Sequence, residues 1–258
     1  MVDPAHTQGR FRVRLEWGAS GAATLASGSD LAVVVDVLSF TTTLSVALER
    51  GMTVYPYRWR DDGAAAYAAE RDAVLAVGRL EARHGQAGVS LSPAALAEAP
   101  SEELPARLVL PSPNGSAISF ALADSGATVV GACLRNAAAV AAWLSPRLAS
   151  GASVAVIPAG ERWPDGTLRP AVEDLWGAGA VLARLTDAVG ADGFSPEARF
   201  AASAFEQVAP DLATALLDCA SGRELVEKDF AADVAAASRL DHGRAVPVLA
   251  GEAFEPAG

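Results

Sequence analysis

The pattern of hydrophobic positions divides the chain into short apolar runs and longer segments with helical periodicity. The short runs are rich in β-branched residues and are bounded by glycine, proline or polar residues, as buried strands are. Strands are predicted at residues 31–37, 53–57, 107–110, 128–130, 153–157 and 246–249.

Alanine-rich segments with helical spacing of apolar residues lie between these runs. Helices are predicted at residues 41–50, 64–76, 93–98, 137–144, 171–189, 196–219 with a break near Pro210, and 229–240. Ser92-Pro93 and Ser195-Pro196 have the order of an N-cap followed by a first-turn proline. Strands that alternate with helices indicate an α/β fold whose largely parallel sheet is covered on both faces.

Part of this pattern occurs twice. The segment Leu-Ser-Val-Ala-Leu at residues 44–48 recurs as Ile-Ser-Phe-Ala-Leu at 118–122, and each copy follows an apolar strand and a polar turn. We interpret this internal repeat as a duplicated unit of strand, turn, helix and strand. The alternative is chance similarity between two alanine-rich helices. A true duplication predicts that the two polar turns face one sheet edge or meet around a pseudo-dyad.

The composition of the chain limits the classes of partner that it is expected to bind. The chain has 258 residues, 51% of them hydrophobic, which is enough for a substantial core in one large domain or two small ones. A net charge of −11 repels nucleic acid and anionic lipid, and no apolar run approaches the roughly 20 residues of a membrane span. We therefore expect a soluble protein that binds neither nucleic acid nor membrane.

The cysteine content and the N-terminal residues indicate the cellular compartment that we expect for this protein. Cys133 and Cys219 are too few for a disulfide framework, and residues 1–10 lack the apolar stretch of a secretory signal. Both observations favour a cytoplasmic location. Lys228 is the only lysine, so arginine carries almost all of the positive charge.

The first polar turn follows the predicted strand at 31–37. It places an acid and several hydroxyls where a following helix directs its unpaired N–H groups, which is how anion sites begin in α/β sheets. Its candidate residues are Asp36, Ser39, Thr41, Thr42 and Thr43. The alternative is structural: Thr41 caps the helix and Asp36 accepts hydrogen bonds from nearby backbone.

The second polar turn, at residues 111–116, offers Asn114, Gly115 and Ser116. Asn-Gly forms tight turns because both residues tolerate positive φ, and this explanation suffices for the pair. Here the turn precedes a predicted helix, so its N–H groups and the Asn114 amide could also hold an anionic oxygen.

A third segment, the loop at 158–170, leads into the helix that contains Glu173 and Asp174. Acids in a first helical turn are stabilised by the helix dipole, which accounts for them without a ligand. Together with Asp36 they would also form a hard oxygen site for Mg²⁺. By element order, Arg135 and Arg162 are the arginines best placed to bind an anion, and Asn136 is an expected N-cap.

Several catalytic classes lack their motifs in this chain. There is no Gly-x-x-x-x-Gly-Lys phosphate loop, no Gly-x-Ser-x-Gly elbow, no histidine pair with metal-ligand spacing and no arginine six residues after Cys133. Leu38 follows Asp36 at the second position, so the paired aspartates of haloacid-dehalogenase-type phosphatases are absent as well.

Taken in order, the segments resemble the 2-phosphosulfolactate phosphatase family across roughly residues 30–250. The matching pieces are Val35-Asp36-Val37-Leu38 with Thr41-Thr42-Thr43, Ser112-Pro113-Asn114-Gly115, Leu134-Arg135-Asn136, Pro158-Ala159-Gly160, Glu173-Asp174 with Gly177-Ala178-Gly179, Phe230-Ala231-Ala232-Asp233, Asp241 and Val246-Pro247.

The resemblance implies a three-layer α/β/α architecture in one compact unit, residues 1–258, built from two similar intertwined halves at about 1–130 and 131–258. It also implies Mg²⁺-dependent hydrolysis of a small phosphorylated acid such as 2-phospho-3-sulfolactate, on the route to coenzyme M. On this reading Asp36, Glu173 and Asp174 are catalytic residues and metal ligands, and the two turns, Arg135, Asn136 and Arg162 bind the substrate. A homodimer is a reasonable expectation.

Three departures from the family pattern leave the substrate open. Ser39 stands where the family usually has an arginine, and Leu91 replaces an asparagine before Ser92-Pro93. The Gly-Glu-Arg stretch that precedes this segment in the family is matched only loosely around Gly78-Arg79. Three readings therefore stay open: a phosphatase for this or another small phosphorylated acid, a noncatalytic anion-binding relative, and an enzyme with an altered reaction on the same scaffold.

Overall fold

The computed structural model describes residues 3–58, 63–84 and 88–258, and in this part of the chain nine strands form one mixed sheet. The sheet order is β1-β7-β2-β6-β10-β11-β3-β5-β4, and β8 and β9 form a separate small hairpin. The strands are β1 Val13–Leu15, β2 Leu31–Val35, β3 Thr53–Tyr57, β4 Val74–Leu75, β5 Arg107–Pro111, β6 Thr128–Ala132, β7 Val154–Pro158, β8 Glu161–Arg162, β9 Leu168–Arg169, β10 Pro247–Ala250 and β11 Ala253–Pro256.

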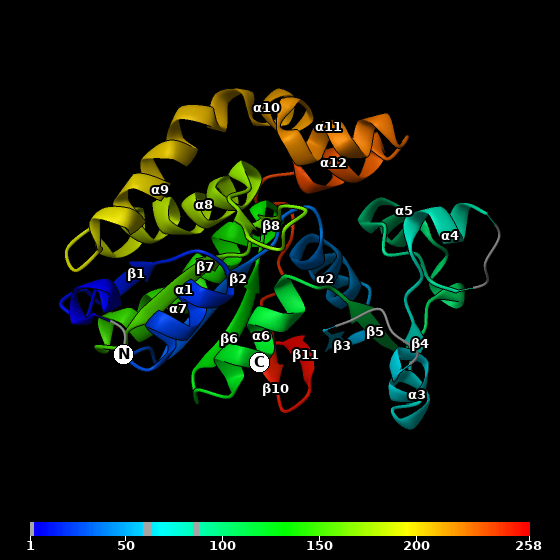
Figure 1. The fold of residues 1–258 in the computed structure, drawn as a ribbon, viewed down its shortest axis with the longest axis horizontal. Helices are drawn as coiled ribbons and strands as arrows, with labels where there is room; N and C mark the ends of the chain where they lie inside the picture. Colours follow the sequence, from blue (N-terminus) through cyan, green and yellow to red (C-terminus); the bar gives the residue numbers. More distant parts are fainter. Residues whose placement is uncertain (1–2, 59–62, 85–87) are drawn as a thin grey trace.

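Helices flank the sheet on both faces (Figure 1). They are α1 Gly18–Ala26, α2 Phe40–Glu49, α3 Gly63–Glu70, α4 Arg79–Arg83, α5 Pro93–Glu98, α6 Gly115–Ala123, α7 Ala137–Ala149, α8 Val172–Val189, α9 Pro196–Val208, α10 Leu212–Asp218, α11 Ala220–Glu227 and α12 Ala231–Ala237. Four short 3₁₀ turns are η1 Pro4–Thr7, η2 Ser101–Glu103, η3 Leu134–Asn136 and η4 Ala209–Asp211. None of the helices in the described ranges has the length and apolarity needed to cross a membrane.

Strand β2 lies at the centre of the core. Its residues alternate between two hydrophobic clusters: Leu31, Val33 and Val35 pack with α7, α8 and α9, whereas Ala32 and Val34 pack with α1, α2 and α6. A strand buried on both faces carries a continuous apolar run, which is why the sequence pattern identified it. β2 pairs in parallel with β6 and β7, so its end brings Asp36 beside the ends of both neighbours.

Two crossover connections link the two parallel parts of the sheet. The unit β2-α2-β3 leads from the β2/β6 pair to the β3/β5 pair, and β5-α6-β6 leads back. The antiparallel hairpin β10-β11 lies between the two parts and makes the sheet mixed. The predicted α/β fold with a mostly parallel, helix-covered sheet is therefore confirmed, while the symmetry of the two halves stays a prediction.

Most predicted elements are present, with shifted ends. The helix predicted at 64–76 is wrong beyond Glu70, because Asp72 has a φ of +49° and the next residues join the sheet as β4. The helix predicted from 229 begins only at Ala231, since Asp229 has a φ of +61°. The break near Pro210 is confirmed as η4, and Ser92 and Ser195 both cap their helices.

Candidate active site

The two polar turns meet at Asp36. Its Oδ1 accepts a hydrogen bond from the Phe40 N–H at 3.2 Å. Its Oδ2 accepts from the Gly115 N–H at 3.1 Å and lies 3.4 Å from the Ser112 hydroxyl. Because Gly115 opens α6 and Phe40 opens α2, the carboxylate lies at the N-termini of both crossover helices, where N–H groups favour negative charge.

Burial nevertheless dominates the ionisation of this carboxyl. Asp36 is only 8% exposed, and burial raises its pKa to about 6 against the opposing effect of its backbone hydrogen bonds. The nearby charge of Glu173 contributes to this raised pKa. An acid at the end of a strand with a pKa this close to neutrality is typical of functional sites.

Glu161 is a second acid of the same region. It starts β8, and its Oε2 accepts a hydrogen bond from the Asn114 amide at 3.1 Å. Burial, and next the charge of Asp36, raise the pKa of Glu161 to about 7. Glu161 lies in the loop predicted at 158–170, and the sequence pattern predicts no role for it.

A cavity of about 450 Å³ opens beside these residues. Its polar lining combines acids, hydroxyls and bases, and its apolar lining comes from leucine, proline and phenylalanine. The polar lining residues are Asp36, Ser39, Thr43, Arg79, Glu81, Ser112, Asn114, Glu161, Ser221, Glu224 and Lys228. A concave site at strand ends with a few convergent polar groups is the usual form of a small-molecule site.

Asp174 ties two strand ends together behind the cavity. Its Oδ1 accepts from the Val37 N–H at 2.7 Å, just after β2, and its Oδ2 accepts from the Gly160 N–H at 2.8 Å, just after β7. Burial, and then the charges of Asp36 and Glu173, raise its pKa well above the usual range. Both oxygens accept hydrogen bonds from backbone N–H groups, and Asp174 is not among the residues that line the cavity.

Glu173 is also buried, at 2% exposure, and lies behind the cavity lining. Its Oε2 has no hydrogen-bond partner among the described residues. Its charge acts on Asp36, Glu161 and Asp174, which places the four acids in one electrostatic cluster. It also contacts Cys219, whose pKa rises to about 12 through burial first and the Glu173 charge second.

The predicted hydroxyl donors divide into two groups. Ser39 and Thr43 line the cavity, although the Thr43 hydroxyl donates to the Leu91 carbonyl at 2.9 Å. Thr41 and Thr42 are fully buried and donate to the carbonyls of Asp36 and Val37, which fixes the turn. Thr41 therefore has a structural role, but it lies inside α2, whose N-cap is Ser39, and does not cap the helix as the structural alternative expected.

The predicted residues of the second turn also fall into two groups, those at the cavity or Asp36 and those away from them. Asn114 lines the cavity and Gly115 contributes its N–H to Asp36. The Ser116 hydroxyl is buried and lies 3.3 Å from the Leu110 carbonyl, away from the cavity lining.

Three further residues that were predicted to contact the substrate do not line this cavity. Arg135 is buried and pairs with Glu49 at 3.0 Å, and Asn136 accepts from the Cys133 N–H and donates to backbone carbonyls. Arg162 is exposed on β8 and lines a neighbouring cavity of about 340 Å³ that shares Asn114 and Glu161 with the first. Element order predicted the correct edge of the sheet for these residues but not the direction of their side chains.

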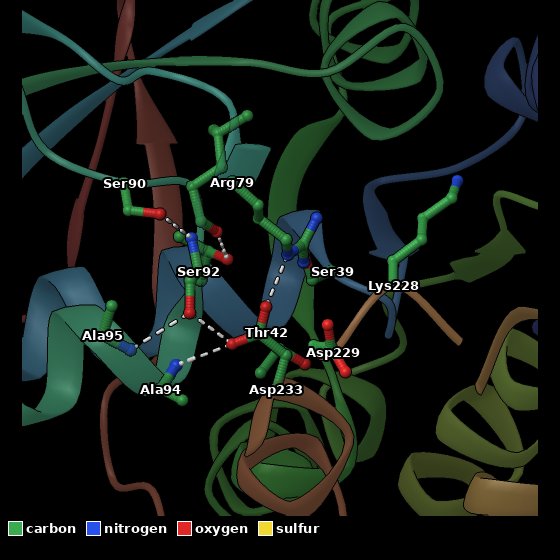
Figure 2. A network of polar contacts seen from close by, with 12 residues as sticks. Ser39, Thr42, Arg79, Ser90, Ser92, Ala94, Ala95, Lys228, Asp229 and Asp233 are labelled. Atoms are coloured by element: carbon green, nitrogen blue, oxygen red, sulfur yellow. Dashed lines mark hydrogen bonds and ion pairs between the residues drawn. The ribbon is translucent and has the colours of Figure 1, made fainter. Parts of the chain in front are cut away.

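Arg79 is a basic residue of the cavity lining that the sequence pattern does not predict. From the start of α4, its guanidinium donates to the Ser39 hydroxyl and to the Asp233 carboxylate (Figure 2). Ser39, which stands at the expected arginine position, therefore contacts an arginine from another element.

The carboxylates near the cavity can be compared with the ligands that the expected magnesium ion requires. Among the described residues, no three His, Cys, Asp or Glu side chains converge as a metal-holding group. Mg²⁺ commonly uses only one or two protein carboxylates with water and substrate phosphate. Asp36 and Glu161, two mutually repelling acids that line one cavity, fit that smaller set.

The fold and the cavity together define an α/β protein with a polar cavity at the ends of its strands. A family model described as 2-phosphosulpholactate phosphatase matches residues 22–252, so the chain belongs to that family. The family resemblance seen in the order of the sequence motifs is thereby confirmed. Comparison with curated proteins finds no match.

Proposed function

We propose that this protein is a magnesium-dependent phosphatase that hydrolyses a small phosphorylated organic acid. The observation that carries the proposal is the buried carboxylate of Asp36, held where two crossover turns meet and facing a polar cavity of about 450 Å³. Family membership supports the reaction class. The first substrate to test is 2-phospho-3-sulfolactate.

The described contacts suggest how the site would bind a phosphoryl group. Ser39, Ser112 and Asn114 line the cavity with hydroxyl and amide groups that would donate to a phosphoryl group. Asp36 and Glu161 would hold the magnesium ion, which would neutralise phosphoryl oxygens and activate an attacking group. Without a cation, two carboxylates beside a phosphate would repel it, so the acid pair itself argues for a bound ion.

Two roles for Asp36 fit this proposal, metal ligand and nucleophile. A nucleophilic Asp36 would carry the phosphoryl group transiently, whereas a ligand would never be phosphorylated. Acid quenching during turnover, followed by peptide mass spectrometry of residues around Asp36, distinguishes the two roles.

A noncatalytic anion-binding relative is the second candidate. In that case Asp36→Asn would retain or increase anion affinity, because it removes a negative charge from the cavity.

The test of the proposal is phosphate release. The purified protein with Mg²⁺ is offered 2-phospho-3-sulfolactate, 2-phospholactate and other phosphorylated hydroxy acids. Release that depends on the metal and on Asp36 supports the proposal, and release no faster than in metal-free blanks for every substrate rejects it.

A further inference from the structure

A buried carboxylate holds the cationic side chain of the cavity in place. Asp233, 1% exposed at the start of α12, accepts hydrogen bonds from Arg79 and from the Ser92 hydroxyl. It also accepts from the Ala94 N–H at 3.2 Å. One acid thus joins α4, α5 and α12, and Figure 2 shows these groups gathered around it.

The guanidinium that Asp233 orients keeps donors free for a ligand. Arginine has five N–H donors, and the described contacts of Arg79 use one on Asp233 and one on Ser39. The side chain is 18% exposed and lines the cavity. Lys228 is the other basic lining residue in the described ranges, but its side chain is 51% exposed and pairs with Glu224.

The position of Arg79 limits the size of a ligand that could contact both Arg79 and Asp36. Its partner Ser39 lies three residues after Asp36, and three residues of chain span at most about 10 Å. A ligand with a phosphoryl group at Asp36 and an acidic group at Arg79 must therefore be a compact molecule of a few carbons. Resting on the proposed function, we infer that Arg79 is a specificity residue that binds a second acidic group of the substrate, one that is not hydrolysed, and that Asp233 positions it.

The test compares substrates with and without that acidic group. 2-Phospho-3-sulfolactate and 2-phospholactate carry acids beside the phosphate, whereas glycerol 2-phosphate carries none. Loss of a charge-assisted hydrogen bond predicts that Arg79→Gln lowers kcat/KM for the acidic substrates about 10- to 100-fold, mainly through KM. For glycerol 2-phosphate the change should stay below about 3-fold.

Two further variants separate recognition from folding. Arg79→Gln leaves Asp233 buried without its cation, so Arg79→Gln/Asp233→Asn is made in parallel and should show the same selectivity loss with native-like circular dichroism. Arg199→Gln, on the exposed side of α9, controls for the loss of one arginine charge. Equal losses on acidic and acid-free substrates in the double variant would overturn the inference.

A binding measurement keeps this inference separate from the proposed function. Titration calorimetry with 3-sulfolactate, which has no phosphate, should detect binding to the wild type and at least 10-fold weaker binding to the double variant. A protein that releases no phosphate but shows this difference rejects the phosphatase proposal and retains the role of Arg79. Equal binding of 3-sulfolactate to both proteins, or to neither, rejects the role of Arg79.

Discussion

The Gly115 N–H donates to the Asp36 carboxylate at 3.1 Å across 79 positions of sequence. This bond joins the turn after β2 to the turn after β5, and the space around it is filled. A Cβ added at Gly115 would lie 2.8 Å from Asp36 Oδ2 and closer still to the Phe40 ring. The glycine therefore allows the Asp36 and Phe40 side chains to pack closely against the backbone at the start of α6.

Gly115→Ala tests that approach. We expect a loss of about 1–3 kcal/mol in the free energy of unfolding, as in other overpacked sites, together with at least a 10-fold loss of phosphatase activity. Chemical denaturation and phosphate release measure the two effects. Gly51→Ala, where φ is +80° and no atom lies within 4 Å of the added Cβ, is the control: it should lose stability but keep activity. Wild-type activity in Gly115→Ala would contradict this role.

Asp174→Asn tests the tie between two strand ends. The amide oxygen of asparagine can accept only one of the two N–H groups at Val37 and Gly160, so a buried N–H would lose its partner at a cost of about 1–3 kcal/mol. Because the tie positions Asp36, kcat should fall more than KM rises. Asp187→Asn on the exposed face of α8 should change neither stability nor kinetics. Unaltered kcat in Asp174→Asn would show that the tie does not position the site.

Glu161→Gln should change the pH dependence of stability in a defined direction. Because the folded-state pKa of Glu161 is raised to about 7, the folded protein holds this proton more tightly than the unfolded chain, and this group's contribution to stability decreases as pH rises from about 4.5 to 7. The variant lacks this decrease. With EDTA present, the free energy of unfolding of Glu161→Gln should exceed that of the wild type by about 1–3 kcal/mol at pH 8 and by little at pH 4.5. A difference independent of pH in denaturant titrations would contradict the raised pKa.

Metal removal tests the proposed ligands without relying on turnover. Saturating Mg²⁺ should raise the Tm of the wild type by about 5–10 °C relative to EDTA, since an ion at 100 times its Kd contributes about 2.7 kcal/mol. Asp36→Asn and Glu161→Gln should lose most of this increase, whereas Asp187→Asn should keep it. An undiminished increase in both carboxylate variants would place the ion elsewhere.

The elements that could be predicted from sequence are those with strong local signals. The β3 strand and α5 have the predicted bounds, because a short run of β-branched and aromatic residues that ends before Arg58 and a Ser-Pro cap are strong local signals. Helices α1 and α11 were not predicted, since α1 is rich in glycine and small residues and α11 has few apolar positions. The β11 strand was also missed, because it joins the sheet through its pairing with β3, which is distant in sequence, as well as with the preceding strand β10.

The site could be predicted only in part for the same reason. Asp36 and Asn114 follow strands directly, and the order of elements brings them to one cavity. Arg79 comes from a short helix whose orientation depends on Asp233, more than 150 positions away. Arg135 follows a strand as well, but its side chain turns to Glu49. Local patterns predict which edge a residue occupies, while long-range pairing determines what its side chain contacts.

Metal-dependent phosphate release by the wild type and by Asp36→Asn is the most direct test of this account. With Mg²⁺ and 2-phospho-3-sulfolactate or a related phosphorylated hydroxy acid, the wild type should release phosphate and EDTA should abolish it. Asp36→Asn, with native-like circular dichroism, should lose at least about 100-fold in kcat, as expected for a group that contacts the reacting phosphoryl group or its metal ion. Release at the wild-type rate by Asp36→Asn, or release unaffected by EDTA, would contradict the account.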